Sequence, residues 1–113
     1  MTNLLNETMS TLKSIDQRIE DIKFIGSLDS GHSCTWVEFT QLADIEYDNG
    51  FGAQEIASDL VIVFEDGTQL YRDEYDGSEC WAYKAIAVIP RDQQPIKSLT
   101  GGMWNTLEAM HNE

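Results

Sequence analysis

Apolar residues near the N-terminus recur at every third or fourth position and form one stripe. Charged and amide side chains between Lys13 and Glu20 lie off this stripe. Such a period is typical of an amphipathic helix, so the pattern predicts a helix over about residues 4–20. The apolar stretch 22–28 follows and ends in the turn residues 29–31, which indicates a short strand. The stripe consists of Leu5, Met9, Leu12, Ile15, Ile19 and Ile22.

A second helix is predicted over residues 36–44. Thr35 and Glu38 have the spacing of a capping box, in which each side chain bonds to the other residue's backbone N–H group. The apolar residues Trp36, Phe39, Leu42 and Ala43 follow at helical spacing. The stretch 46–58 contains two glycines and a turn dipeptide, so we expect a loop there, with one helical turn near residues 54–57.

An antiparallel meander is predicted over residues 59–65, 68–75 and 78–89. These segments are rich in β-branched and aromatic residues, and an Asp-Gly dipeptide separates each from the next. Pro90 and Pro95 end the meander, and a helix over 103–111 follows, with His111 on a frayed end. The prediction is one α+β domain, residues 1–113. It combines an antiparallel β-meander of three to four strands with an N-terminal amphipathic helix, a short middle helix and a short C-terminal helix.

Two-residue turns at the Asp-Gly dipeptides would fix the register of the meander. Counting back from the second turn places Glu74 opposite Glu79 and Arg72 opposite Trp81, and the first turn places Val63 opposite Leu70 and Val61 opposite Arg72. One face then carries Val61, Val63, Leu70, Arg72, Glu74, Glu79, Trp81 and Tyr83. The other carries Leu60, Ile62, Phe64, Tyr71, Asp73, Tyr75, Cys80, Ala82, Ile86 and Val88. We expect the terminal helices on the second, more aliphatic face. The first face would be covered by residues 36–58 or form an interface, such as that of a homodimer.

Acidic residues are concentrated in the middle of the chain. The net charge is −13, from 20 acids and 7 bases. Between Glu38 and Glu79 there are twelve acids and one base, Arg72, so this stretch alone carries 1 − 12 = −11. The charge disfavours nucleic acid and anionic membranes as direct partners, because both are polyanions, and it favours a basic protein surface. Solubility alone is the alternative explanation.

Motifs for catalysis, metal binding and export are not found in the sequence. There is no nucleophile elbow, zinc-protease motif, phosphate-binding loop or dinucleotide-binding fingerprint. His32, Cys34, Cys80 and His111 lack zinc-site spacing, so we expect no metal and no cofactor. The N-terminus lacks the layout of a signal peptide, and the apolar runs are too short for a membrane span. We therefore expect a cytoplasmic protein with reduced thiols, with a Cys34–Cys80 disulfide as the alternative.

Two segments carry a resemblance to known proteins. The run DIEYDNGFGAQEIASDLVIV (44–63), followed by EYDGSECW (74–81), resembles small proteins encoded by bacteriophages and mobile elements. The small, acidic character of the chain is also similar to that of phage-encoded inhibitors of host defence, which include anti-CRISPR proteins and DNA mimics, and to that of colicin-type immunity proteins. Residues 80–113 have no net charge, which departs from the pattern of extended DNA mimics and favours a local acidic patch.

These observations lead to the hypothesis of an acidic, protein-binding inhibitor. Its partner would be a Lys- and Arg-rich protein that handles nucleic acid, and the chain would block it by local mimicry of nucleic acid. Carboxylates would supply steering and specificity, and aromatic residues would supply the apolar anchor. The predicted contact residues are Asp44, Glu46, Tyr47, Asp48, Phe51, Glu65, Asp66, Asp73, Glu74, Tyr75, Asp76, Glu79 and Trp81. The alternatives are an immunity protein against a basic nuclease toxin and a small carboxylate- or metal-dependent enzyme.

Overall fold

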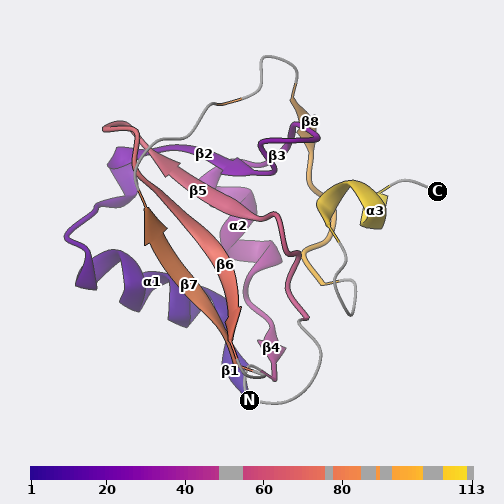
Figure 1. Cartoon of the computed structure of the whole chain (residues 1–113), viewed down its shortest axis with the longest axis horizontal. Coiled ribbons are helices and arrows are strands. Elements are labelled where there is room, and N and C mark those ends of the chain that lie inside the picture. Colours follow the sequence, from indigo (N-terminus) through magenta and orange to yellow (C-terminus); the bar gives the residue numbers. More distant parts are fainter. Residues whose placement is uncertain (49–54, 76–77, 85–88, 90–92, 101–105, 112–113) are drawn as a thin grey trace.

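The chain has an α+β fold in which helices pack against a mostly antiparallel sheet (Figure 1). This computed structural model describes residues 1–48, 55–75, 78–84, 89, 93–100 and 106–111. Four predicted features lie wholly or partly outside the described residues. They are the helical turn near 54–57, the turn residues 76–77, the strand end 85–88 and the helix start 103–105. The helical elements are α1 (Leu4–Ser14), η1 (Ile19–Asp21), α2 (Trp36–Leu42) and α3 (Leu107–His111). The strands are β1 (Thr2–Asn3), β2 (Ile22–Gly26), β3 (His32–Ser33), β4 (Glu46–Tyr47), β5 (Val61–Phe64), β6 (Gln69–Tyr75), β7 (Ser78–Lys84) and β8 (Gln94–Pro95).

Helix α1 is shorter than its apolar stripe predicts. The Asn3 side chain caps its start by accepting a bond from the backbone N–H of Asn6 at 2.9 Å. After Ser14 the chain enters the left-handed region at Asp16, with φ of 58°, and Gln17 N–H donates to Leu12 O at 3.0 Å. This arrangement is a helix stop of the Schellman type. The prediction of one helix over 4–20 is therefore wrong beyond Ser14, and Ile19 lies in η1.

The predicted strand at 22–28 and the predicted helix at 36–44 are present as β2 and α2. The capping box at the start of α2 is confirmed. Thr35 Oγ1 accepts from the Glu38 backbone N–H at 3.1 Å, and Glu38 Oε1 accepts from the Thr35 N–H at 2.8 Å. The expected loop at 46–58 begins instead with β4, which pairs with β1.

The main sheet has the strand order β7-β6-β5-β2-β3-β8, and all its described pairs except β3 with β8 are antiparallel. The register between β6 and β7 is confirmed at each predicted pair, including Arg72 with Trp81 and Glu74 with Glu79. The register between β5 and β6 is wrong by one residue, because Val63 lies opposite Gln69. The cause is a three-residue turn. Phe64 N–H donates to Thr68 O at 2.9 Å, and Gly67 has φ of 89°.

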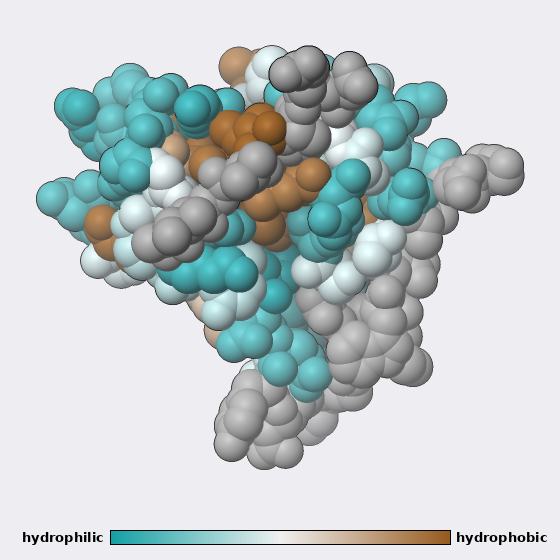
Figure 2. All heavy atoms as spheres, turned by 45° about the horizontal axis from the view of Figure 1, so that its top comes forward, coloured by the Kyte–Doolittle hydropathy of each residue, from teal (hydrophilic) through white to brown (hydrophobic). Residues whose placement is uncertain are grey.

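Because the register of β5 with β6 differs by one residue from the prediction, each side chain of β5 lies on the opposite face relative to β6. Ile62, Phe64, Leu70 and Trp81 lie on one face, with α1, α2 and α3 packed over it. The terminal helices therefore cover the expected side of β5, which carries Ile62 and Phe64, but on β6 and β7 they cover the side that was expected to face away from them. The opposite face carries a second apolar cluster, Phe24, Val61 and Val63, with Leu28, Tyr71 and Ile89 packed against it. Figure 2 shows hydrophobic surface at the centre of a largely hydrophilic side of the molecule. Val61 and Trp81 thus lie on opposite faces of the sheet, so the prediction that they share one face is wrong.

Candidate functional site

Strands β1 and β4 lie beside the point where β6 ends and β7 begins (Figure 1), and these segments and their flanks are rich in acidic residues. Strand β4 is held there because Arg72 Nη2 on β6 donates to the Tyr47 hydroxyl at 2.9 Å. The neighbours of Tyr47 and the residues after Arg72 therefore lie at the same end of the molecule. We call this group the acidic end. It consists of Asp44, Glu46, Asp48, Asp73 and Glu74.

Two of the predicted contact residues lie at the other end of the hairpin. Glu65 and Asp66 are in the β5–β6 turn, separated from the acidic end by the length of β6, about 20 Å. Gln17 binds Asp66 Oδ2 there at 3.2 Å, and Arg18 is 3.6 Å from Asp21. The structure therefore divides the predicted patch between two ends of the molecule. Four of the described bases lie near this second end, namely Lys13, Arg18, Lys23 and Lys84.

Three further predicted contact residues are interior. Tyr47 is fully buried, Glu79 is 2% exposed and Trp81 is 8% exposed. The prediction that their side chains contact a partner is not supported, because these side chains are buried in this structure. Of the remaining candidates, Phe51, Asp76 and the side chain of Tyr75 lie outside the described part of the chain. Asp44, Glu46, Asp48, Asp73 and Glu74 are the predicted residues that the structure brings together.

The interior beneath the acidic end contains a charged network centred on Arg72, whose side chain is fully buried. Its Nη2 and Nε donate to Glu79 Oε2 at 2.9 and 3.2 Å, and its Nη1 lies 3.5 Å from Glu7 Oε2. The guanidinium also stacks 4.7 Å from the ring centre of Trp81. The Tyr47 hydroxyl donates to Glu7, and burial raises the pKa of Tyr47 well above its ordinary value. Tyr47 therefore remains a neutral donor.

Glu79 also connects this network to the segment at residues 55–56. Its carboxylate accepts from the backbone N–H groups of Glu55 and Ile56 at 3.0 and 3.2 Å. The network therefore joins α1, β4, β6, β7 and the segment at 55–56, which fixes the elements that present the acidic end. Sequence reasoning placed Arg72 across from Trp81 but did not find this role. The available signal was that Arg72 is the one base among twelve acids between Glu38 and Glu79.

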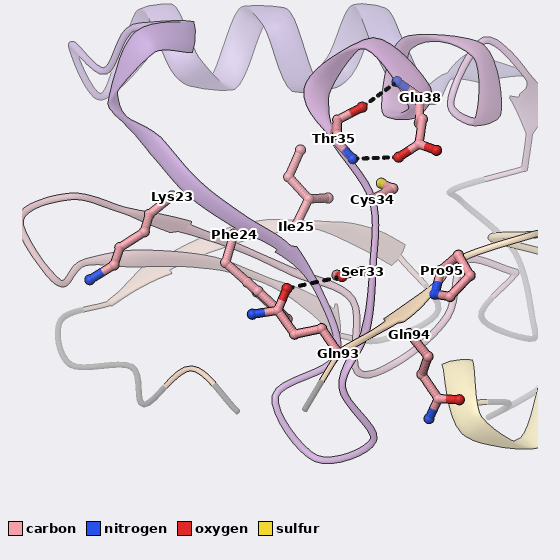
Figure 3. A pocket seen from close by; sticks show the side chains of 10 residues that line it. All are labelled: Lys23, Phe24, Ile25, Ser33, Cys34, Thr35, Glu38, Gln93, Gln94 and Pro95. Atoms are coloured by element: carbon pink, nitrogen blue, oxygen red, sulfur yellow. Dashed lines mark hydrogen bonds between the residues drawn. The ribbon is translucent and has the colours of Figure 1, made fainter. Parts of the chain in front are cut away.

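A hollow of about 470 Å³ lies between β2, β8 and the start of α2 (Figure 3). Its polar groups bond largely within the chain. Ser33 Oγ donates to Gln93 Oε1 at 3.2 Å across the hollow, and the capping box of α2 occupies one wall. Burial, and then the nearby Glu38 carboxylate, raise the pKa of the Cys34 thiol to about 12. Cys34 is therefore a protonated thiol and a poor nucleophile at neutral pH.

The two histidines stack on each other, with ring centres 4.5 Å apart. His111 Nε2 accepts from the backbone N–H groups of Lys97 and Ser98 at 2.6 and 3.3 Å, and Nδ1 lies 2.7 Å from Leu107 O. The expectation that His111 is on a frayed end is therefore wrong. Cys34 and Cys80 are both free thiols. Among the residues that the structure describes, no three His, Cys, Asp or Glu side chains are arranged to hold a metal ion.

Acid is expected to destabilise the fold through His32. Burial, and then the neighbouring His111, lower the pKa of His32 below the ordinary value of 6.5, against smaller opposite effects of Asp59 and Glu108. Below pH 6.5 the unfolded chain takes up a proton that the folded chain does not, so stability falls as pH decreases from 6.5 toward the folded pKa. Urea unfolding at several pH values should show a weaker acid dependence for His32→Gln than for the parent. Equal slopes would contradict this role.

No family model matches this chain, and no curated protein or solved structure matches it significantly. Within the described residues, no helix has the length and apolar character needed to cross a membrane. A functional assignment therefore depends on the geometry of the chain's own residues, above all on the acidic end and the strands beside it.

Proposed function

We propose that this domain is a protein-binding inhibitor that occupies a basic surface of a nucleic-acid-handling protein, of the anti-CRISPR or a related anti-defence type. The observation that carries the proposal is the acidic end. Five carboxylates from β4, its flanks and β6 gather there, while four of the described bases lie near the opposite end. Acids, among them Asp16, Glu20, Asp21, Glu65 and Asp66, accompany those bases, so the charge at the opposite end is mixed, whereas the five residues of the acidic end are all negative.

The negative electrostatic field of the acidic end is complementary to a partner that binds phosphate groups. Surfaces that bind nucleic acid present Lys and Arg side chains, and a cluster of carboxylates attracts the same side chains over several ångströms. Such complementarity raises the association rate and selects the partner more than it adds affinity. Binding at the acidic end would block access of nucleic acid by occlusion.

The source of affinity differs from the sequence-based hypothesis. Tyr47 and Trp81 were expected to be apolar anchors, but both are buried in the domain core. Large exposed apolar side chains near this region are Met1, which precedes β1 and is 83% exposed, and Tyr83 on β7, which is 45% exposed. Affinity for the partner therefore requires contacts made by the sheet itself, in addition to the charges of the acidic end.

Reversing charge at the acidic end is expected to weaken binding at least tenfold, since each close charge pair across an interface contributes about 1.5 kcal/mol or more. The variant is Glu46→Lys with Asp73→Lys, two exposed carboxylates. The matched control is Glu20→Lys with Glu65→Lys, which changes net charge equally at the opposite end. The tagged parent would first capture its partner from a bacterial lysate, and biolayer interferometry would then compare the three proteins.

The control should bind like the parent, and binding of the parent should fall steeply between about 50 and 200 mM salt and in the presence of competing DNA. Equal loss in both variants, or binding insensitive to salt, would refute the proposal. The identity of the captured protein separates a defence inhibitor from an immunity protein against a nuclease toxin.

A further inference from the structure

Strand β7 forms one outer edge of the main sheet. All seven of its residues pair with β6, and no other described strand lies on its far side. The pairing is regular, without a bulge in the described register. Natural edge strands are usually shortened, bulged or interrupted by proline or lysine, because an open edge can pair with another chain. In β7 the single described lysine is Lys84, at the last position.

The direction of the free backbone groups follows from the neighbouring hydrogen bonds. Phe64 N–H bonds to Thr68 O, so even-numbered residues of β6 point their backbone groups toward β5. The odd-numbered residues of β6 therefore bond to β7, at its even-numbered positions. This leaves the N–H and C=O groups of Glu79, Trp81 and Tyr83 directed away from the sheet, and no backbone bond outside the ladders involves them in the described chain. Glu79 as a whole is 2% exposed, so the edge that a partner can reach lies at Trp81 and Tyr83.

The charge around this edge specifies what would pair with it. The strand starts at the acidic end, where Asp73 lies directly across from Cys80 and Glu74 across from Glu79. Glu79 is directed inward and neutralised by Arg72 at 2.9 Å, so the nearby field comes from the acidic end. A second copy of the chain would bring together two molecules of net charge −13. An extended basic segment meets no such repulsion.

We propose that β7 accepts an extended, Lys- or Arg-rich segment of the partner as an added strand of the sheet. Backbone bonds to positions 81 and 83 would supply affinity independent of sequence, as in other cases of strand addition. Alternate basic side chains of that segment would extend across β7 toward Asp73 and the rest of the acidic end. The inference rests on the proposed function and adds the conformation and chemistry of the partner segment.

Tyr83→Pro is the decisive variant. The N–H of Tyr83 faces outward, so proline at this edge position removes one donor for an added strand without removing a bond to β6. Tyr83→Thr is the matched control, because it removes the same side chain and keeps the N–H group. The probe is a fluorescent decapeptide of alternating lysine and threonine, and circular dichroism confirms the fold of each variant.

The peptide should bind the parent and Tyr83→Thr alike, and bind Tyr83→Pro about tenfold or more weakly. In the parent, the peptide should slow amide hydrogen exchange at Trp81 and Tyr83, whereas Cys80 and Ala82 are already bonded to β6. Exchange on the parent also tests the inference if Tyr83→Pro does not fold. Equal binding by the proline and threonine variants, or no added protection at these two amides, would overturn the inference.

The same peptide separates this inference from the proposed function. If the Glu46→Lys, Asp73→Lys variant loses binding while Tyr83→Pro retains it, strand addition is refuted and the acidic end still binds basic protein. If charge reversal has no effect while Tyr83→Pro loses binding, the edge is confirmed as a strand acceptor and the electrostatic proposal fails.

Discussion

Replacing Arg72 with methionine is expected to lower the free energy of unfolding by about 3–5 kcal/mol, a large part of the stability of a small domain. The Arg72 side chain is fully buried, and Glu79 beside it is 2% exposed. Removing the guanidinium leaves the Glu79 carboxylate in the interior with two backbone donors and no opposite charge at contact distance. It also removes one of the bonds that hold Tyr47. Urea unfolding followed by fluorescence would measure the change.

The double variant Arg72→Met, Glu79→Gln tests whether the unpaired charge is the cause. Glutamine is neutral and its amide oxygen can still accept one of the two backbone bonds from 55–56, so the double variant should be more stable than Arg72→Met alone. If the double variant is no more stable than Arg72→Met, the unpaired Glu79 carboxylate is not the cause of the loss, which then comes from the contacts of Arg72 with Tyr47 and Trp81. If Arg72→Met unfolds like the parent, the network does not hold this end of the molecule together.

Gly26→Ala is expected to cost about 3 kcal/mol of stability, the second largest effect. Gly26 has φ of 155°, and a Cβ atom there would lie 1.8 Å from the backbone oxygen of His32. That oxygen accepts from Ser27 N–H at 2.9 Å, so it cannot move without breaking the contact between β2 and β3. Thermal or urea unfolding would show the loss.

Gly67→Ala is the matched control for this prediction. Gly67 also has positive φ, 89°, but a Cβ atom there would meet no atom within 4 Å. The control should therefore show only the backbone strain of an alanine in the left-handed region, about 1 kcal/mol. A Gly67→Ala cost equal to that of Gly26→Ala would mean that backbone strain, and not the clash with His32, sets the effect.

The buried network and the exposed acids act together. Arg72 pairs with Glu79 inside the domain, and its side chain is fully buried, so the one base of the acidic stretch is not exposed at the surface. The interior charge pair thereby supports both the fold and the negative field at the acidic end. Loss of Arg72 would accordingly affect binding through unfolding, whereas loss of Glu46 and Asp73 should affect binding alone.

The sequence by itself determined the elements whose signals are local. The Thr35–Glu38 capping box places the start of α2, and the Asp-Gly dipeptide at 76–77 gives the register of β6 with β7. Both depend on backbone bonding and conformation within a few residues, which residue type specifies directly. The acidic stretch likewise established that the chain carries a strong negative charge.

Only the tertiary structure decided which side chains are inside and where the charge lies. The turn at Glu65–Gly67 has three residues and not two, a difference that an Asp-Gly dipeptide does not specify, and this slip placed the helices over Leu70 and Trp81. Glu79 is interior because Arg72 and two distant N–H groups converge on it. The length of β6 separates Glu65 from Glu74 although both belong to one acidic run. Burial and separation depend on contacts between residues far apart in the chain, which local sequence patterns do not determine.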